Sequence, residues 1–200
     1  MTRTVDLENR AALLERVSAY VLEHGLADLS LRPLARAVGS SPRVLLYHFG
    51  SKEAIVTAVL RNIRAQQLAV FDHLRSSDLS TPAAVCRAAW AYMTNSRVLP
   101  MLRLFFETYA LALRDPERFP GFLEGAVEDW LRFLSEPACC KATDPRRART
   151  LATVILAGFR GFMLDFAATQ DRERVGAALD AWADSLDALS EKDPDHAQQA

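Results

Sequence analysis

The chain has 200 residues and a net charge of −1, and Ala (32) and Leu (28) far outnumber Val and Ile (16 together). This balance predicts helices rather than sheets, because β-branched residues favour strands. No apolar run approaches the roughly 18 residues of a membrane span. The polar N-terminus does not resemble a secretory signal. Three cysteines, two of them adjacent, give neither a disulfide framework nor a metal site. We therefore expect an all-α, cytoplasmic protein with no membrane segment, metal or cofactor.

Charge is distributed unevenly along the chain. Residues 1–64 contain nine Lys or Arg against six Asp or Glu, a net of +3. The other 136 residues contain fifteen against nineteen, a net of −4. A small basic part joined to a larger acidic part suggests that nucleic acid is contacted at the N-terminal end.

Two helices are predicted in the first forty residues. Leu13 and Val21 belong to a set of apolar residues at helical spacing, and Gly25 stands where a left-handed cap would end that helix. After a short connector, Ser30 is a candidate cap for a second helix, which Gly39 ends.

A short third helix and a long fourth helix follow. Ser41 and Pro42 form an N-cap with proline at the first helical position, and the helix that they open extends to about Phe49. Ser51 caps the fourth helix, which extends to about residue 74. The two short helices, separated by residues 39–41, match a helix-turn-helix unit whose second helix enters the major groove. A three-helix bundle with a tight turn is the alternative on this pattern alone.

The residues themselves favour the first interpretation. The ungapped segment 31–54 resembles the TetR family of bacterial transcription regulators, and the resemblance covers roughly residues 10–55. It implies a helix-turn-helix DNA-binding domain over residues 1–51 and a helical effector-binding and dimerisation domain over 52–190. The polar sequence of residues 191–200 predicts a disordered tail. The residues that carry it are Ala35, Gly39, Ser41, Leu45, Tyr47, His48, Phe49, Lys52 and Glu53.

The resemblance also implies which residues contact double-stranded DNA. In the family the start of the third helix reads base edges, and its end and the next helix hold phosphates. Arg43 is the best candidate for base reading, because its fork matches guanine O6 and N7, although a solvated surface arginine is the alternative. His48 either donates to phosphate or supports the turn between the helices. The DNA-binding set is Ser40, Ser41, Arg43, Tyr47, His48 and Lys52.

One position departs from the family pattern. The family usually has a tyrosine three positions before the residue equivalent to Phe49, whereas this chain has Leu46 there and a tyrosine at position 47. A phosphate contact from Tyr47 must therefore come from a different direction around the helix.

Five further helices are predicted in the remainder. They begin near Thr81-Pro82, Val98, Gly121, Arg146 and Asp171, with a loop over residues 135–144. In the second of them Glu107 recurs with Arg103 and Arg114 on a polar stripe, which predicts a solvated side chain.

Aromatic residues and methionine are abundant in these helices. If a small-molecule effector binds, they are candidates to enclose it, with Asn95, Thr108 and Asp165 as polar anchors. The alternative is a solid core, and for Asp165 a rim position open to water. The candidate set is Trp90, Met93, Phe105, Phe106, Tyr109, Trp130, Phe159, Phe162 and Asp165.

The last two helices predict a packing seam. Small residues in the first allow close approach of backbones, and apolar residues in the second follow 4-3 spacing. In the family these helices pair with a second chain, so the resemblance implies a homodimer; packing within one chain is the alternative. The candidate interface residues are Ala157, Gly158, Gly161, Val175, Leu179, Trp182 and Leu186.

Together these features predict a DNA-binding transcriptional regulator rather than an enzyme. We expect a repressor that binds a palindromic operator as a homodimer and is released by a small, largely apolar effector. A regulator controlled by a protein partner or by no ligand is the alternative, and a helical small-molecule carrier or enzyme is a remote one. No nucleophile–base pair, phosphate loop or histidine cluster in the sequence supports catalysis.

Overall fold

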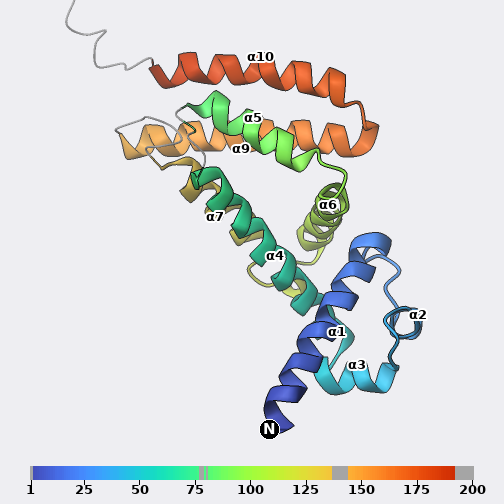
Figure 1. Cartoon of the computed structure of the whole chain (residues 1–200). Coiled ribbons are helices and arrows are strands. Elements are labelled where there is room, and N and C mark those ends of the chain that lie inside the picture. Colours follow the sequence, from blue (N-terminus) through green and yellow to red (C-terminus); the bar gives the residue numbers. More distant parts are fainter. Residues whose placement is uncertain (1, 77–78, 80, 137–143, 192–200) are drawn as a thin grey trace, which may run out of the picture. The chain divides into compact units, whose positions relative to one another are not determined.

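A computed structural model describes residues 2–76, 79, 81–136 and 144–191 (Figure 1). These residues form α-helices and one 3-10 turn, with no strand among them, which confirms the expected fold class. The predicted loop over 135–144 lies largely outside the described residues, as do Cys139, Cys140 and the predicted tail. The elements are α1 (Thr2–His24), α2 (Leu31–Ala37), α3 (Pro42–Phe49), α4 (Lys52–Ser76), α5 (Pro82–Met93), α6 (Leu99–Arg114), η1 (Pro116–Arg118), α7 (Phe122–Leu134), α9 (Pro145–Thr169) and α10 (Arg172–Glu191).

Helix starts follow the capping residues of the sequence. The Ser41 hydroxyl accepts a hydrogen bond from the Val44 amide at 3.2 Å, and the hydroxyls of Thr81 and Ser51 cap α5 and α4 in the same way. In each case a side-chain oxygen satisfies a backbone amide that has no partner within the helix. Ser30 occupies the N-cap position of α2, but its side chain makes no capping hydrogen bond. The prediction that Ser30 caps α2 is therefore correct for its position and wrong for its hydrogen bond.

The chain packs as two compact units. The first contains residues 1–69 and 103–120, and the second contains residues 70–102 and 121–200. This division differs from the expected boundary at residue 51, because most of α4 and the larger part of α6 pack with the N-terminal helices. Sequence periodicity shows which face of α6 is apolar but not which helices cover it.

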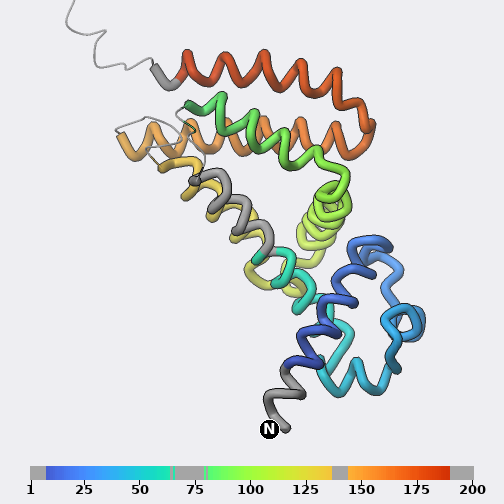
Figure 2. Tube along the Cα trace, viewed as in Figure 1, coloured from blue at the N-terminus to red at the C-terminus, as the bar shows by residue number. Residues whose placement is uncertain are grey.

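The core of the first unit joins its four N-terminal helices. Val17 of α1, Leu34 of α2, Leu45 of α3 and Ile55 of α4 are all fully buried. Gly39, with φ of +63°, makes the turn between α2 and α3 in a conformation that glycine adopts without strain. Figure 2 shows the sharp changes of chain direction from α2 into α3 and from α3 into α4.

In the second unit α10 lies along α5 and packs on α9, and α7 contacts α9 (Figure 1). Polar contacts set the position of α10 on α5. Arg87 of α5 bonds Asp180 at 2.9 Å and Asp184 at 2.5 Å, and Asp187 accepts the Ala83 amide at 3.0 Å. Because all three carboxylates belong to α10, they hold it in register with α5.

Helix α9 is long and apolar enough to cross a membrane by length and composition alone. The sequence interpretation had considered only uninterrupted apolar runs and did not detect this property. A core helix of a soluble protein passes the same test, and seven residues of α9, from Ala148 to Phe166, are buried against the rest of the chain.

Candidate nucleic-acid interface

Helix α3 has one buried and one exposed face. Leu45 and Phe49 are buried in the unit, whereas Arg43, Val44 and Tyr47 are exposed, Tyr47 to 75%. Tyr47 neighbours both Arg43 and Val44 on the helix surface, because steps of three and four residues return to the same side of a helix. We call Arg43, Val44 and Tyr47 the reading face. A single cation beside two apolar groups is suited to base edges, where guanine offers acceptors and thymine a methyl group.

The two serines at the start of α3 are partly committed to the fold. The Ser41 oxygen caps the helix, as described above, and its hydroxyl proton remains available as a donor. Ser40 is half-buried, and its amide donates to the Ala35 carbonyl at 2.8 Å. Both residues are thus fixed by the turn, at the N-terminal end of the reading face where such a helix approaches bases.

The end of α3 leads directly into the N-terminus of α4. Gly50, with φ of +88°, separates the helices, and the Ser51 hydroxyl accepts from the Ala54 amide at 3.1 Å. Lys52 is half-buried in the first turn of α4. A cation and backbone amides at a helix N-terminus together favour a phosphate.

Glu53 lies in the same turn and has the opposite charge. Hydrogen bonds from its own amide and from Ser51 lower the pKa of the Glu53 carboxyl below its ordinary value. Its carboxylate is therefore stabilised at the same helix N-terminus that would hold a phosphate, and the balance of charge there depends on the neighbouring cations.

His48 and Leu46 complete this end of α3. The His48 ring is half-buried and packs edge-on against the Tyr47 ring at 5.0 Å. Leu46, which replaces the usual family tyrosine, is 39% exposed and has no hydrogen-bonding side chain. Leu46 cannot make the phosphate contact that a tyrosine hydroxyl at this position allows.

Two arginines of α1 hold the ends of the short helices, and sequence reasoning assigned neither. Arg16 Nε donates to the Val38 carbonyl at the end of α2, and Arg10 Nε donates to the His48 carbonyl at the end of α3, both at 3.2 Å. Cations at helix C-termini are favourable because the last carbonyls lack partners within the helix. The sequence could have indicated these roles, because both arginines belong to the helix whose apolar residues pack under α2 and α3.

Glu107 is not the solvated residue that its stripe predicts. Its carboxylate accepts hydrogen bonds from the Leu26 amide at 2.9 and 3.0 Å and from the Ala27 amide at 2.7 Å. Gly25 has φ of +77°, a conformation that favours glycine, and a Cβ there would lie 2.8 Å from the same carboxylate. We call this contact the Glu107 clasp. It joins α6 to the connector between α1 and α2 within the first unit.

The candidate effector residues divide between the two units. Phe105, Phe106 and Tyr109 belong to the first unit, where Phe105 packs its ring against Phe106 at 5.3 Å and Tyr109 at 5.7 Å. In the second unit Trp90 is buried, 5.4 Å from the Phe166 ring. The other candidates in the second unit are half-buried: Met93, Trp130, Phe159 and Phe162. Trp130 and Phe159 also pack on the apolar core. A role in ligand binding stays a prediction for each of them.

The three candidate polar anchors have partners in the chain. The hydroxyl of Thr108, which is fully buried, donates to the Leu104 carbonyl at 2.7 Å. The side chain of Asn95, which is exposed, accepts from the Arg97 amide at 2.9 Å. Neither side chain needs a ligand to satisfy it.

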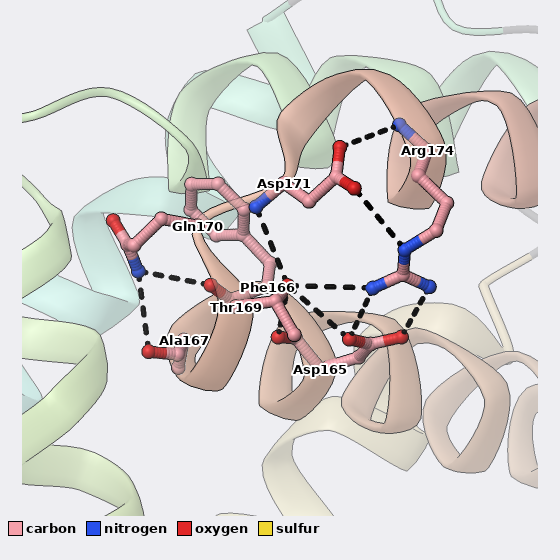
Figure 3. Close-up of polar contacts among 7 residues, drawn as sticks. All are labelled: Asp165, Phe166, Ala167, Thr169, Gln170, Asp171 and Arg174. Atoms are coloured by element: carbon pink, nitrogen blue, oxygen red, sulfur yellow. Dashed lines mark hydrogen bonds and ion pairs between the residues drawn. The ribbon is translucent and has the colours of Figure 1, made fainter.

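Asp165 lies in a polar network at the turn between α9 and α10 (Figure 3). Both of its oxygens accept from Arg174, at 2.7 and 3.0 Å, and its side chain is 41% exposed. Asp171 also bonds Arg174, and Gln170, with φ of +58°, donates to two carbonyls at the end of α9 (Figure 3). The structure gives Asp165 an arginine partner at a rim position, as the rim alternative predicts, and gives no support to a buried ligand group.

The candidate dimer residues include some that are buried within the chain and some that are exposed. Val175, Leu179 and Leu186 of α10 are buried within the chain, so the 4-3 seam packs inside one protomer. A Cβ at Gly158 would collide with the Trp182 ring, and this glycine therefore serves packing between α9 and α10. Only two of the seven, Ala157 and Gly161, are exposed.

The short α3 after a capped turn, its exposed reading face and the basic groups at its end define a helix-turn-helix DNA-binding protein. Residues 20–59 match the family model of the bacterial regulatory proteins of the tetR family. The chain is 26% identical over 182 residues to the HTH-type transcriptional regulator BetI of Rhizobium meliloti strain 1021, covering 88% of this chain and 75% of that protein.

Solved structures agree with this class. A TetR-family regulator from Rhodococcus sp., described as putative, superposes with a TM-score of 0.70 at 17% identity, covering 90% of this chain and 98% of that one. The multidrug binding protein EbrR, solved with imidazole, superposes with a TM-score of 0.58 at 27% identity, covering 85% of this chain and 92% of that one. The chain thus has the fold of TetR-family regulators, and its match over residues 20–59 and its similarity to BetI indicate a DNA-binding transcriptional regulator.

Proposed function

We propose that the protein is a cytoplasmic repressor that binds a palindromic operator as a homodimer and is released by a small, largely apolar effector. The observation that carries the DNA part is the reading face of α3, in which Arg43 is exposed between apolar neighbours. A two-fold dimer would place two such faces one helical turn of DNA apart, which explains the expected palindrome.

The dimer contact proposed here differs from the seam predicted by the sequence. An exposed stripe of small and apolar residues follows α9 at 3- and 4-residue spacing, and it includes Val154 and Leu164, which are 40% and 53% exposed. Gly161 leaves the centre of this stripe open, with nothing within 4 Å of a built Cβ. Such a surface allows a second helix to approach closely. We call it the α9 stripe: Val154, Ala157, Gly161, Leu164 and Ala168.

Control by a ligand is supported by relatives rather than by a described cavity. EbrR, 27% identical, is described as a multidrug binding protein. The aromatic residues of the second unit supply the apolar surface that such ligands need. An effector that favours a separation of the reading faces unlike that of the operator would weaken DNA binding by the coupling free energy between the two sites.

DNA binding is tested by affinity as a function of salt, with sequences selected from a random duplex pool. We expect a steep fall of affinity with salt, since several phosphates are neutralised. Lys52→Ala should weaken binding to all sequences alike, whereas Arg43→Ala should relax preference at one base position, at a cost of about 1–3 kcal/mol there. Wild-type affinity and preference in both variants would contradict this placement of α3 on DNA.

Ligand control is tested separately, by thermal shift of the purified protein against apolar and aromatic compounds, followed by operator release. A compound that raises the melting temperature and lowers operator affinity supports the proposal. Compounds without effect on a protein that binds its operator would favour the alternative, a regulator controlled by a protein partner or by none.

A further inference from the structure

Arg10 of α1 lies at the end of the reading helix, and none of the predicted contacts includes it. Its Nε donates to the His48 carbonyl at 3.2 Å, and its guanidinium carbon lies 5.1 Å from the centre of the Phe49 ring. The side chain is nevertheless exposed. The guanidinium is thus held by one nitrogen and one ring face while it remains in contact with solvent.

This anchoring leaves the rest of the guanidinium suitable for an anion. Arginine has five N–H donors in a planar fork, and the bond to His48 uses only the Nε–H. The four N–H groups of the terminal nitrogens lie outside that bond. Because the side chain is already held, less rotamer freedom is lost when a phosphate binds than for a mobile lysine or arginine.

Arg16 offers a comparison within the same helix. It makes the same type of bond, from Nε to the Val38 carbonyl, but that bond is partly buried, whereas the Arg10 bond is exposed. Both side chains are exposed, and they differ in which helix end they hold: Arg10 holds the end of α3, the helix that carries the reading face.

Arg10 adds a donor at the end of α3 to those of the predicted DNA-binding set. Leu46 replaces the family tyrosine and cannot donate a hydrogen bond, and the Glu53 carboxylate places negative charge at the start of α4. Arg10 is bonded to the residue two before Gly50, and Lys52 follows two residues after it. Arg10 adds a second cation to the segment between the end of α3 and the start of α4, where Glu53 contributes a negative charge.

We propose that Arg10 binds a backbone phosphate of the DNA through its terminal nitrogens while its Nε holds the end of α3. This inference rests on the DNA binding of the proposed function and adds a residue outside the helix-turn-helix motif. A contact of this kind carries no sequence information, but it fixes the orientation of the reading face on the duplex.

The test compares Arg10→Gln with Arg103→Gln in the full-length protein. Gln keeps an amide donor for the His48 carbonyl and removes the charge, so the fold should persist, which melting temperatures check. Arg103 is exposed on α6 and is the charge-matched control. Affinity for random-sequence duplexes is measured from about 50 to 200 mM salt. We expect Arg10→Gln to reduce the slope of log affinity against log salt by about one and to lower affinity about tenfold at 0.1 M salt.

Arg103→Gln should leave the slope unchanged, and Arg10→Lys should restore it, because a lysine still neutralises the phosphate. An unchanged slope in Arg10→Gln, with or without lower affinity, would mean that Arg10 only supports the fold and would overturn the proposal. So would an equal loss of slope in Arg103→Gln. If the wild-type protein itself showed no salt-dependent binding, the proposed function would fail instead, which separates the two results.

A second measurement identifies the phosphate. In a selected duplex, single phosphates are replaced by neutral methylphosphonates, and each duplex is tested with the wild type and with Arg10→Gln. We expect one position per half-site at which neutralisation weakens the wild type but not the variant. If every methylphosphonate weakened the variant by the same factor as the wild type, Arg10 would contact none of the phosphates.

Discussion

Gly158 and Gly161 belong to the same helix, but their surroundings differ. A Cβ at Gly158 would collide with Trp182, whereas nothing lies within 4 Å of a Cβ built at Gly161. We expect Gly158→Ala to destabilise the protein by about 1–3 kcal/mol, because overpacking forces neighbours to shift. Gly161→Ala should raise the stability of the isolated protomer by up to about 1 kcal/mol, because alanine is the better helix former.

Urea unfolding at a low protein concentration, where association is minimal, measures both variants. The pair controls for helix propensity, since the same substitution is made three residues apart. Equal stabilities for the two variants would mean that Trp182 does not pack over Gly158.

The ion pair of Asp165 and Arg174 predicts a pH dependence. Hydrogen bonds from Arg174 lower the pKa of Asp165 below its ordinary value of 3.8. A carboxyl whose pKa is lower in the folded state stabilises the fold above its unfolded pKa and loses that contribution as the pH falls through the folded pKa. Asp165→Asn should therefore be less stable than the wild type at neutral pH, and the difference should shrink in acid.

Thermal unfolding between neutral pH and the acid limit of folding measures this effect, which is modest because both side chains are exposed to water. Glu124→Gln, a change at an exposed acid of α7, is the control. A difference between Asp165→Asn and wild type that is constant with pH would show that the ion pair contributes nothing.

At the scale of elements, the Glu107 clasp connects α6 with the connector between α1 and α2. Glu107→Gln keeps one acceptor oxygen but removes the charge and places an amide group against backbone donors. We expect a loss of about 1–3 kcal/mol in stability and faster hydrogen exchange at the amides of Leu26 and Ala27. Glu23→Gln, a change at an exposed acid of α1, is the matched control.

Hydrogen exchange followed residue by residue provides the decisive measurement, because it reports on the two amides themselves. If they exchange at the same rate in Glu107→Gln and in the wild type, the carboxylate does not hold the connector.

Most helix boundaries could be predicted from the sequence because local chemistry sets them. A serine or threonine before proline begins α3 and α5, and Asp144 before Pro145 begins α9, where its carboxylate accepts from two amides. The seam of α10 was predicted as a set of residues but not as a contact. Spacing shows that Val175 and Leu179 share a face, yet it cannot show that α5 of the same chain covers that face.

The candidate site was predictable to the same extent. Arg43 and Tyr47 could be placed on an exposed face from their position in a recognisable motif. The roles of Arg10 and Glu107 depend on main-chain atoms of residues far away in the sequence. Almost every residue has the same backbone carbonyl and amide, so the amino-acid sequence does not indicate which of them a side chain will bind. Periodicity therefore assigned Glu107 to the solvent.

At the scale of the whole molecule, the α9 stripe predicts how the protein associates. Leu164 is 53% exposed in the protomer, and an arginine there would place a charge in the proposed contact. We expect Leu164→Arg to convert a dimer into a monomer and to weaken binding to a palindromic operator much more than binding to a single half-site.

Light scattering coupled to size exclusion gives the mass, and titration with full and half operators gives the affinities. Arg172→Leu, a change at an exposed residue beside the α9–α10 turn, controls for altered surface charge. A Leu164→Arg protein that remained a dimer would locate the contact elsewhere on the molecule.

The Glu107 clasp has a consequence for exchanging parts between related regulators. The carboxylate grips peptide N–H groups, which every amino acid except proline possesses, so the side chains at positions 26 and 27 are not specified by it. A foreign sequence could therefore replace this connector, provided that it has a glycine at position 25, an apolar residue at position 26, where Leu26 is buried, and no proline at either of the next two positions. Chimeras that break this rule should lose the hydrogen bonds that attach the connector to α6.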